Sequence, residues 1–222
     1  MVAREMLADV VPPVKTSDTV QKVLDRMAEF RVSHLPVVNE VQFLGLISDE
    51  DLIEVADYNS PVGSLDLPLT TVDRYVDENR HVYDIVRMMN EKSLSVLPVL
   101  DARLNYLGLI SVNTIIEFIA QTLSVKEPGG IIVLEVSSRE NSLSHIAQIV
   151  ESNNSQILSS YIRSFEDSTR LEVTLKLNHR DISPIVAAFT RYNYVVKETF
   201  NDIKNDNDNG DRYDQLMNYL SF

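Results

Sequence analysis

The 222-residue sequence contains no cysteine. Disulfides, thiol catalysis and thiolate metal sites are therefore excluded. Basic residues are scarce beside acidic ones, since 20 Lys and Arg stand against 33 Asp and Glu, for a formal net charge of −13. A surface of this sign repels the phosphates of nucleic acids and of anionic membranes, so we expect neither as a partner.

Long apolar runs and targeting signals are also missing. No apolar stretch approaches the roughly 18 residues of a membrane span. The first residues, MVAREMLADVV, lack the basic start and the long apolar segment of a signal peptide. We therefore expect a cytoplasmic protein, with a length that suits one large domain or two small ones.

Recognisable catalytic motifs are absent as well. The sequence has no G-x-S-x-G elbow, no P-loop and no G-x-G-x-x-G turn, and its four histidines are dispersed. Asn205, Asn207, Asn209 and Gly210 fall near the ligand positions of a calcium-binding loop, but its twelfth position would be Leu216, where a glutamate is needed. We expect neither catalytic residues nor a metal site.

The sequence does contain an internal repeat. FLGLISDEDLIE at 43–54 is matched by YLGLISVNTIIE at 106–117, and VSHLPVV at 32–38 is matched by LSVLPVL at 94–100. Upstream, both copies show the i, i+3, i+4, i+7 spacing of a buried helix stripe: Val20, Val23, Leu24 and Met27 in the first, Val82, Ile85, Val86 and Met89 in the second. Each copy reads strand, helix, strand, turn, strand, helix, and pairing the copies would bury their short strands.

This doubled pattern resembles the CBS domain, and the resemblance covers roughly residues 1–125, with repeats at about 1–60 and 66–125. It implies two β-α-β-β-α units related by a pseudo-two-fold axis. It also implies two clefts, which in many members bind an adenosine compound such as AMP, ADP, ATP or S-adenosylmethionine.

The resemblance points to particular ligand-binding residues. The ribose-binding pattern of the family, G-h-h-[ST]-x-x-[DN], is matched in full by the first copy, with Ser48 and Asp51. The second copy keeps Ser111 but has Thr114 in place of the acid, and one hydroxyl cannot accept both protons of a diol. Ser48 and Asp51 also fit a capping box at a helix start, which gives them a structural role in either case.

Three further residues are expected at the first cleft. Thr16, within VKTSD at 14–18, would face an adenine edge, and His34 and Arg31 could meet a phosphate. In the second copy, Val96 stands in place of His34 and Ser93 in place of Arg31, and both are uncharged. Either the copies have diverged in role or these surface positions have drifted; the first reading makes the Asp51 cleft the stronger site and the Ser111–Thr114 cleft a second, weaker one.

A different domain follows. KEPGG at 126–130 is typical of a linker. Residues 131–200 then show the order β-α-β-β-α-β of a ferredoxin-like fold, which makes the whole chain α+β. This unit resembles the ACT domain, a regulatory fold that binds amino acids, and Asn141 in the turn 137–142 would line such a site. Alternatively, Asn141 or Ser142 only caps the helix that follows.

The last part, 201–222, reads as an acidic loop and a short helix. Its segment 212–222 has an apolar stripe, so it should form a helix only by docking onto a surface. Its apolar positions are Tyr213, Leu216, Met217 and Leu220.

We interpret the chain as a non-catalytic regulatory sensor of an adenosine-type ligand. The alternatives are a structural or protein-interaction module with empty clefts, amino-acid sensing through the ACT-like domain, and an enzyme with an unrecognised carboxylate site. A homodimer is expected, because a ferredoxin-like sheet leaves one face uncovered and CBS pairs commonly dimerise through their helices. The regulated protein is not indicated by the sequence.

Overall fold

The computed structural model describes residues 1–7, 11–65, 74–137, 142–166 and 168–201. The chain forms two compact units, Met1–Phe118 and Ile119–Phe222. Their boundary falls inside helix α4 (Val112–Thr122), before residue 125, where the sequence suggested that the first domain ends. No helix in the described part of the chain is long and apolar enough to cross a membrane.

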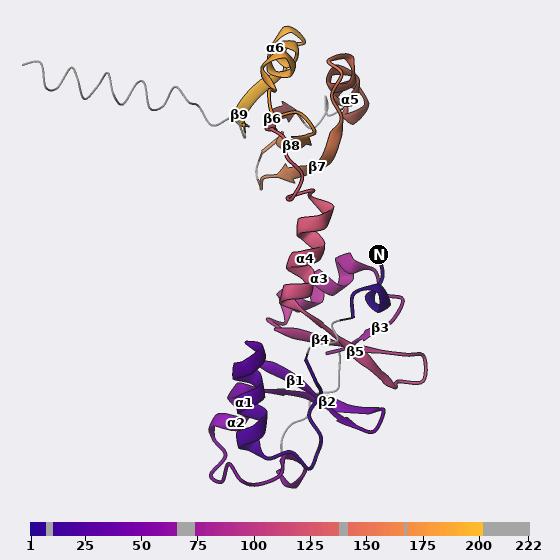
Figure 1. Ribbon diagram of the computed structural model, residues 1–222, viewed down its shortest axis with the longest axis vertical. Helices are drawn as coiled ribbons and strands as arrows, with labels where there is room; N and C mark the ends of the chain where they lie inside the picture. The colour runs from indigo at the N-terminus through magenta and orange to yellow at the C-terminus, as the bar shows by residue number, and fades with distance from the viewer. Residues whose placement is uncertain (8–10, 66–73, 138–141, 167, 202–222) are drawn as a thin grey trace, which may run out of the picture. The chain divides into compact units, whose positions relative to one another are not determined.

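The first unit contains one arrangement of strands and helices twice (Figure 1). The first copy comprises α1 (Val20–Phe30), β1 (His34–Asn39), β2 (Gln42–Ser48) and α2 (Asp49–Ile53). The second comprises β3 (Val76–Asp77), α3 (Val82–Glu91), β4 (Val96–Leu100), β5 (Tyr106–Ser111) and α4. In the first copy, the opening strand is reduced to a parallel bridge between Val14 and Val37, which mirrors the pairing of Val76 with Val99. The duplicated order predicted from the sequence is confirmed.

Both hairpins contain a bulge at the same place. The register shifts after the pair Val37–Gly45 in β1–β2 and after the pair Val99–Gly108 in β4–β5. Gly108 has φ 151°, and a Cβ there would lie 3.2 Å from the side chain of Leu7. A bulge bends its strand and re-aims the residues that follow. Here those residues are the end of each strand and the serine that starts the next helix.

The helices bury the stripes that their periodicity predicts. Val20, Val23 and Met27 of α1 are buried, and so are Val82, Ile85 and Met89 of α3. Val86 is the exception, because its side chain is 37% exposed. Both stripes join one core cluster with the inward residues of all four hairpin strands: Leu35, Val37, Leu46, Ile47, Val96, Leu97, Val99, Leu109 and Ile110.

The two copies exchange their opening turns. The 3₁₀ turn η1 (Ala3–Glu5) precedes the first copy, yet the amide of Ala3 donates to the carbonyl of Arg80 in the second at 2.9 Å. The turn η2 (Val62–Ser64) precedes the second copy, yet the amide of Val62 donates to the carbonyl of Asp18 in the first, also at 2.9 Å. Asp18 and Arg80 are equivalent positions, so each copy covers the other in the same way.

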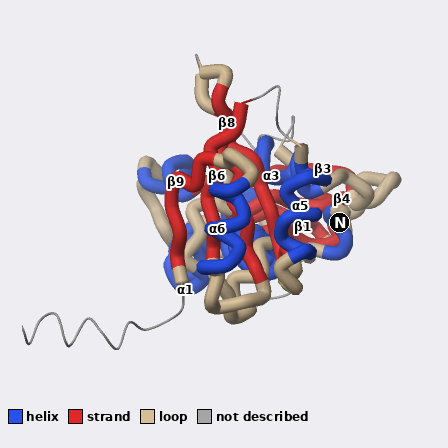
Figure 2. Tube along the Cα trace, turned by 90° about the horizontal axis from the view of Figure 1, so that it is seen from above, coloured by secondary structure: helices blue, strands red, loops and turns tan. Residues whose placement is uncertain are grey.

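The second unit is a four-stranded antiparallel sheet with two helices (Figure 2). Its elements are β6 (Ile131–Ser137), α5 (Leu143–Ser152), β7 (Ile157–Ser164), β8 (Arg170–Leu177), α6 (Ser183–Arg191) and β9 (Val195–Phe200). The strand order β7-β8-β6-β9 and the connections confirm the ferredoxin-like fold and the α+β class. In β8, Val173, Leu175 and Leu177 are buried and alternate with polar residues, so one face of the strand joins the core.

Helix α5 packs one face onto the sheet. Ile146, Ile149 and Val150 are buried on that face, whereas Leu143 at the start of the helix is 46% exposed. The apolar residues of α5 that belong to the core therefore begin at Ile146.

The last two residues of the predicted linker, Gly129 and Gly130, contact the backbone at the end of β8. The amide of Gly130 donates to the carbonyl of His179 at 2.7 Å. Gly129 has φ 155°, and a Cβ at this position would lie 1.8 Å from the carbonyl oxygen of Leu177. The paired glycines of KEPGG therefore do more than mark a linker in the sequence, because they permit the close approach of two backbones.

Candidate functional site

The first strand-to-helix corner is closed by Ser48 and Asp51. The amide of Asp51 donates to Ser48 Oγ at 3.2 Å, and the Ser48 amide donates back to Asp51 Oδ2 at 2.8 Å, which completes the predicted capping box. Ser48 Oγ also donates to Oδ2, at 2.7 Å. Among the described residues no donor reaches Asp51 Oδ1. The carboxylate is thus oriented through one oxygen and available through the other.

The second corner repeats this arrangement without a charge. The amide of Thr114 donates to Ser111 Oγ at 3.2 Å, and the hydroxyls of Ser111 and Thr114 lie 3.0 Å apart. Both serines are buried, at 9% exposure for Ser48 and 7% for Ser111. The two corners therefore have the same backbone arrangement. They differ in the group that faces a ligand, which is the carboxylate of Asp51 in the first corner and the hydroxyl of Thr114 in the second.

The structure places Arg31 at the second corner. A cavity of about 840 Å³ is lined there by Ser95, Ser111, Thr114 and Glu117, with Arg31 and Val32 from the end of α1. Arg31 ends α1 in the left-handed conformation, with φ 53°, and its side chain is exposed. It was expected beside Asp51, but its nearest cleft is that of Thr114, because the end of α1 faces the other copy's corner.

His34 lies between the copies. Ser95 Oγ accepts the amides of Ser33 and His34, both at 3.0 Å, and lies 3.2 Å from His34 Nδ1. The Ser33 hydroxyl also lies 2.9 Å from Nδ1, and the Ser95 amide, which can only donate, points at the same nitrogen from 3.5 Å. Nδ1 then acts as an acceptor, and the ring is neutral with its proton on Nε2.

The charges around His34 agree with a neutral ring. Burial lowers the pKa of His34 below its usual value, and the positive charge of Arg74 acts in the same direction. The carboxylates of Asp49, Asp51 and Glu50 act against this shift without reversing it. His34 therefore lies in the electrostatic field of the Asp51 corner as a neutral group at pH 7, and not as a cation that could pair with a phosphate.

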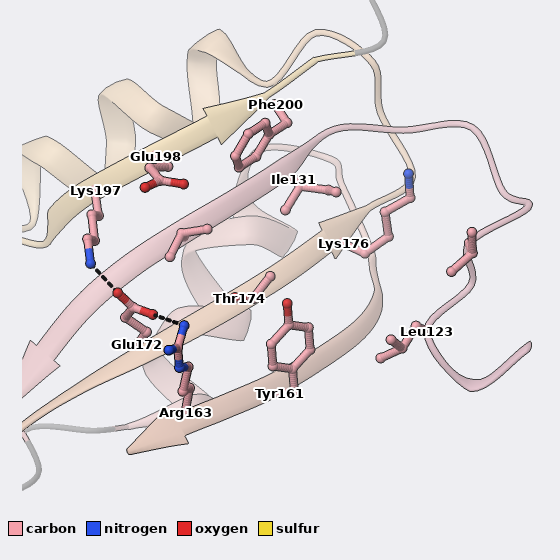
Figure 3. Close-up of a pocket in the computed structure, with 12 residues that line it drawn as sticks. Leu123, Ile131, Tyr161, Arg163, Glu172, Thr174, Lys176, Lys197, Glu198 and Phe200 are labelled. Atoms are coloured by element: carbon pink, nitrogen blue, oxygen red, sulfur yellow. Dashed lines mark hydrogen bonds and ion pairs between the residues drawn. The ribbon is translucent and has the colours of Figure 1, made fainter. Parts of the chain in front are cut away.

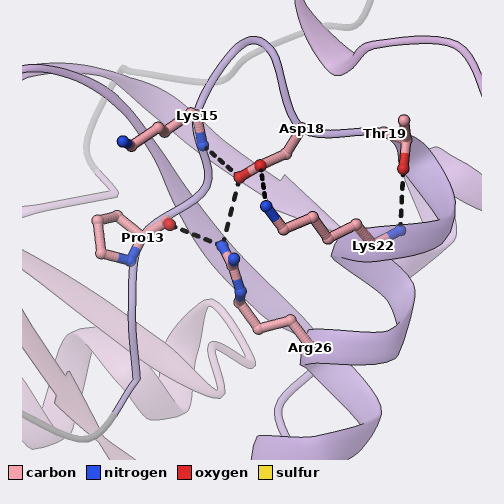
Figure 4. A network of polar contacts seen from close by, with 6 residues as sticks. All are labelled: Pro13, Lys15, Asp18, Thr19, Lys22 and Arg26. Carbon is pink, nitrogen blue, oxygen red and sulfur yellow. Dashed lines mark hydrogen bonds and ion pairs between the residues drawn. The ribbon is translucent and has the colours of Figure 1, made fainter.

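The segment that carries Thr16 is fixed by a buried carboxylate (Figure 4). Asp18 accepts from the Lys15 amide at 2.9 Å and from Lys22 Nζ at 2.6 Å, and Arg26 Nη1 lies 3.5 Å away while donating to the Pro13 carbonyl at 2.8 Å. Burial raises the pKa of Asp18, but the hydrogen bonds from Lys22 and Lys15 and the charges of Lys22 and Arg26 outweigh it, and the net shift is downward.

Thr16 itself packs against η2. Its carbonyl accepts from the Gly63 amide at 2.8 Å, and a Cβ on Gly63 would lie 2.8 Å from Thr16 Cβ. Within the described ranges it makes no hydrogen bond to Ser48 or Asp51. Of the residues expected at the first cleft, Ser48, Asp51 and His34 therefore lie near one another. Arg31 lies instead with Ser111 and Thr114. Thr16 lies on the segment that Asp18 fixes.

Two residues near the corners were missed from the sequence. Ser95 joins His34 to the second cleft, and Arg74 acts on the pKa of His34. Ser95 is the repeat counterpart of Ser33, so a pseudo-two-fold argument applied to Ser33 would have found it. Nothing in the sequence marks Arg74, because it lies outside the repeated phrases.

Asn141 lies outside the described residues. Ser142 caps α5, since its hydroxyl accepts the amide of His145 at 3.3 Å. Beside it, a cavity of about 610 Å³ is lined partly by aromatic rings, and His145 Nδ1 lies 2.9 Å from the Tyr194 hydroxyl.

Several solved structures are similar to about half of this chain. A CBS domain pair/ACT domain protein from Thermotoga maritima is 24% identical, with a TM-score of 0.48 over 55% of this chain and 99% of its own. CBSX2, solved in complex with AMP, is 23% identical, with a TM-score of 0.46 over 57% of this chain and 98% of its own. The cytosolic domain of the Mg²⁺ channel MgtE, in complex with ATP, is 26% identical, with a TM-score of 0.38 over 48% of this chain and 44% of its own.

A family model gives a firmer assignment. The model of the CBS domain matches residues 3–58 and 65–121, which together make slightly more than half of the chain. Each match contains one of the two copies seen in the fold, including its serine-capped corner. The chain therefore belongs to the CBS domain family, of which it carries a tandem pair.

Proposed function

We propose that the protein is a non-catalytic regulatory sensor whose CBS pair binds an adenosine-containing ligand at the Ser48–Asp51 corner. The observation that carries the proposal is the state of the Asp51 carboxylate. Oδ2 is held by the Ser48 amide and hydroxyl, while Oδ1 has no donor within the described residues. The two lone pairs of Oδ2 are used by these two donors, so a ribose diol would donate both of its hydrogen bonds to the two lone pairs of Oδ1.

The charges at this corner favour some adenosine ligands over others. Helix α2 begins with Asp49, Glu50 and Asp51, and the neighbouring His34 is neutral. A triphosphate would bring four negative charges toward these carboxylates. We therefore expect S-adenosylmethionine, which is positively charged at sulfur, or AMP to bind more tightly here than ATP.

We expect the second cleft to be a weaker site that prefers ligands with phosphate groups. Its cavity of about 840 Å³ falls in the range of small-molecule pockets, and Arg31 offers a guanidinium for a phosphate. It lacks the carboxylate for the diol. Binding there should follow the phosphate and depend little on the ribose.

The ferredoxin-like unit is proposed to be an ACT-like regulatory domain. Its topology and the cavity beside His145 and Tyr194 support this role. Amino-acid sensing through this unit remains the alternative function, and a protein with empty clefts is the other.

The deciding experiment is a thermal-shift panel with AMP, ADP, ATP, NAD and S-adenosylmethionine, followed by calorimetry. A ligand at 100 times its Kd stabilises the native state by about 2.7 kcal/mol. An amino-acid panel run alongside tests the alternative. A chain that no adenosine compound stabilises or binds would contradict the proposal.

Variants at the two corners then locate the site. Asp51→Ala removes a charge-assisted hydrogen bond worth roughly 1.5–3 kcal/mol, so affinity should fall about ten- to a hundredfold. Thr114→Ala is the matched control at the equivalent position and should leave this binding nearly unchanged. Arg31→Ala should weaken only a phosphate-dependent second event. Equal losses in Asp51→Ala and Thr114→Ala would contradict the asymmetry.

A further inference from the structure

Within the described residues, the sheet of the second unit has one buried face. Ile132 and Leu134 of β6 point into the core beneath α5 and α6, while Ile131 and Val133 point to the opposite face. Both described helices of this unit pack on the core face. The opposite face, which we call the open face, is therefore bare in the part of the chain that the structure describes.

The open face has a charged end whose groups already pair with one another (Figure 3). Glu172 lies 3.8 Å from Arg163 and also pairs with Lys197, while Arg170 pairs with Glu135 on the neighbouring strand. Because these charges neutralise one another, we do not expect the charged end to attract a charged partner.

The other end of the open face is apolar. Tyr161 and Phe200 are 50% and 53% exposed there and flank Ile131 and Val133. The chain after α4 forms a rim, because Ser159 Oγ donates to the Leu123 carbonyl at 2.9 Å, and Val125 beyond it is 63% exposed. A cavity of about 500 Å³ begins between the rim and Phe200 and extends to the charged end, where Arg163, Glu172 and Lys197 also line it. The exposed side chains of the apolar end are large, and leaving them in water is unfavourable.

We propose that residues 212–222 of the same chain dock on this apolar end, with Tyr213, Leu216, Met217 and Leu220 facing the sheet. This segment lies outside the described residues, and its apolar positions have the spacing of one helix face. Eleven residues are too few for a stable helix in water, so the segment needs such a surface to fold. The proposal is independent of the adenosine site.

Chain connectivity favours this occupant. Phe200, the last residue of β9, lines the cavity itself, so the chain leaves β9 from the edge of the proposed site. The 11 residues at 201–211 reach at most about 40 Å. A tether of this length holds the segment at an effective concentration in the millimolar range, far above that of a second molecule at micromolar protein.

The charges of the tether also fit the site. Residues 201–211 contain four aspartates and one lysine. Lys176 stands at the apolar end, and its Nζ donates to the Gly129 carbonyl at 2.9 Å, with no carboxylate paired to it among the described residues. An acidic tether passing Lys176 would supply that missing partner.

Disulfide trapping tests the contact directly, because the natural chain has no cysteine. The pair Tyr161→Cys and Met217→Cys should form an intrachain disulfide under mild oxidation. The matched control, Tyr161→Cys with Gln215→Cys, places the second thiol on the far side of the stripe and should cross-link several-fold more slowly. A disulfide between chains would show that a second copy occupies the face. Equal rates, or no disulfide in either pair, would likewise overturn the proposal.

Amide exchange gives a second measurement without cysteine. The double variant Leu216→Asp, Leu220→Asp should speed exchange in β7 and β9 several-fold and leave the CBS pair unchanged. Gln215→Asp with Asn218→Asp adds the same charge on the polar side and should leave exchange as in the natural chain. Unchanged exchange in the first variant, or the same increase in both, would contradict docking through the stripe.

Discussion

Single side chains in this protein do their work by holding backbone in place, and Asp18 is the clearest example. Its carboxylate is 8% exposed and binds the Lys15 amide, Lys22 and Arg26 together. These contacts connect the segment before α1 to the helix itself. A buried carboxylate without such partners would be costly, so the contacts are what permit its burial.

This network predicts a particular pH dependence of stability. The pKa of Asp18 is lowered in the folded state, so its contribution is present above the unfolded pKa of about 3.8 and is lost as the pH falls through the lower, folded pKa. Asp18→Asn should cost roughly 1.5–3 kcal/mol of unfolding free energy at pH 7 and much less near pH 2. Urea titrations at both pH values measure this. A cost that is the same at both would mean that the charge contributes nothing.

At the junction before β6, two backbone segments lie so close together that only glycine fits between them. A Cβ on Gly129 would lie 1.8 Å from the Leu177 carbonyl oxygen, and the backbone there has positive φ. Gly129→Ala must therefore push apart the start of β6 and the end of β8, at a cost of about 3 kcal/mol or more.

The effect of Gly129→Ala should be local. Amide exchange in β6 and β8 should speed up, while the CBS pair exchanges as in the natural protein and serves as the internal control. If the variant melted like the natural protein, with unchanged exchange in both strands, the close approach seen here would not exist in solution.

The elements that a sequence predicts well are those that depend on local pattern. The repeated helix stripes and the Ser48–Asp51 capping box each follow from neighbouring residues, and each is present in the structure. The position of Arg31 was not predictable in this way. It depends on which copy's corner the end of α1 faces, and that is decided by packing between repeats. Spacing in the sequence holds no information about that packing.

At the scale of the whole molecule, exposed apolar residues on α3 and α4 bear on association. Val86, Val112 and Ile116 are 37%, 43% and 58% exposed, and Val86 and Val112 line a shallow cavity between these helices. Apolar residues gathered in this way on a helix surface are typical of a protein interface. We therefore retain the prediction of a homodimer and place its contact at these helices.

The prediction is tested by sedimentation at micromolar concentration. The natural chain should have twice its own mass of 25.2 kDa. Ile116→Asp should yield a folded monomer, because the new charge would be buried without a partner. Ile53→Asp is the matched control in the equivalent helix of the first copy, where Ile53 is 65% exposed. A natural chain that sediments as a monomer would contradict the prediction.

The exchanged opening turns have a consequence for how this molecule can be divided. The turn that covers the start of α1 is encoded after the first copy, and the turn that covers the start of α3 is encoded before it. A fragment cut between the copies would therefore carry a cover that it cannot use and lack the one that it needs. The pair is the smallest piece that can be excised, transplanted or inherited intact, and a lone copy would have to find its missing turn on another chain.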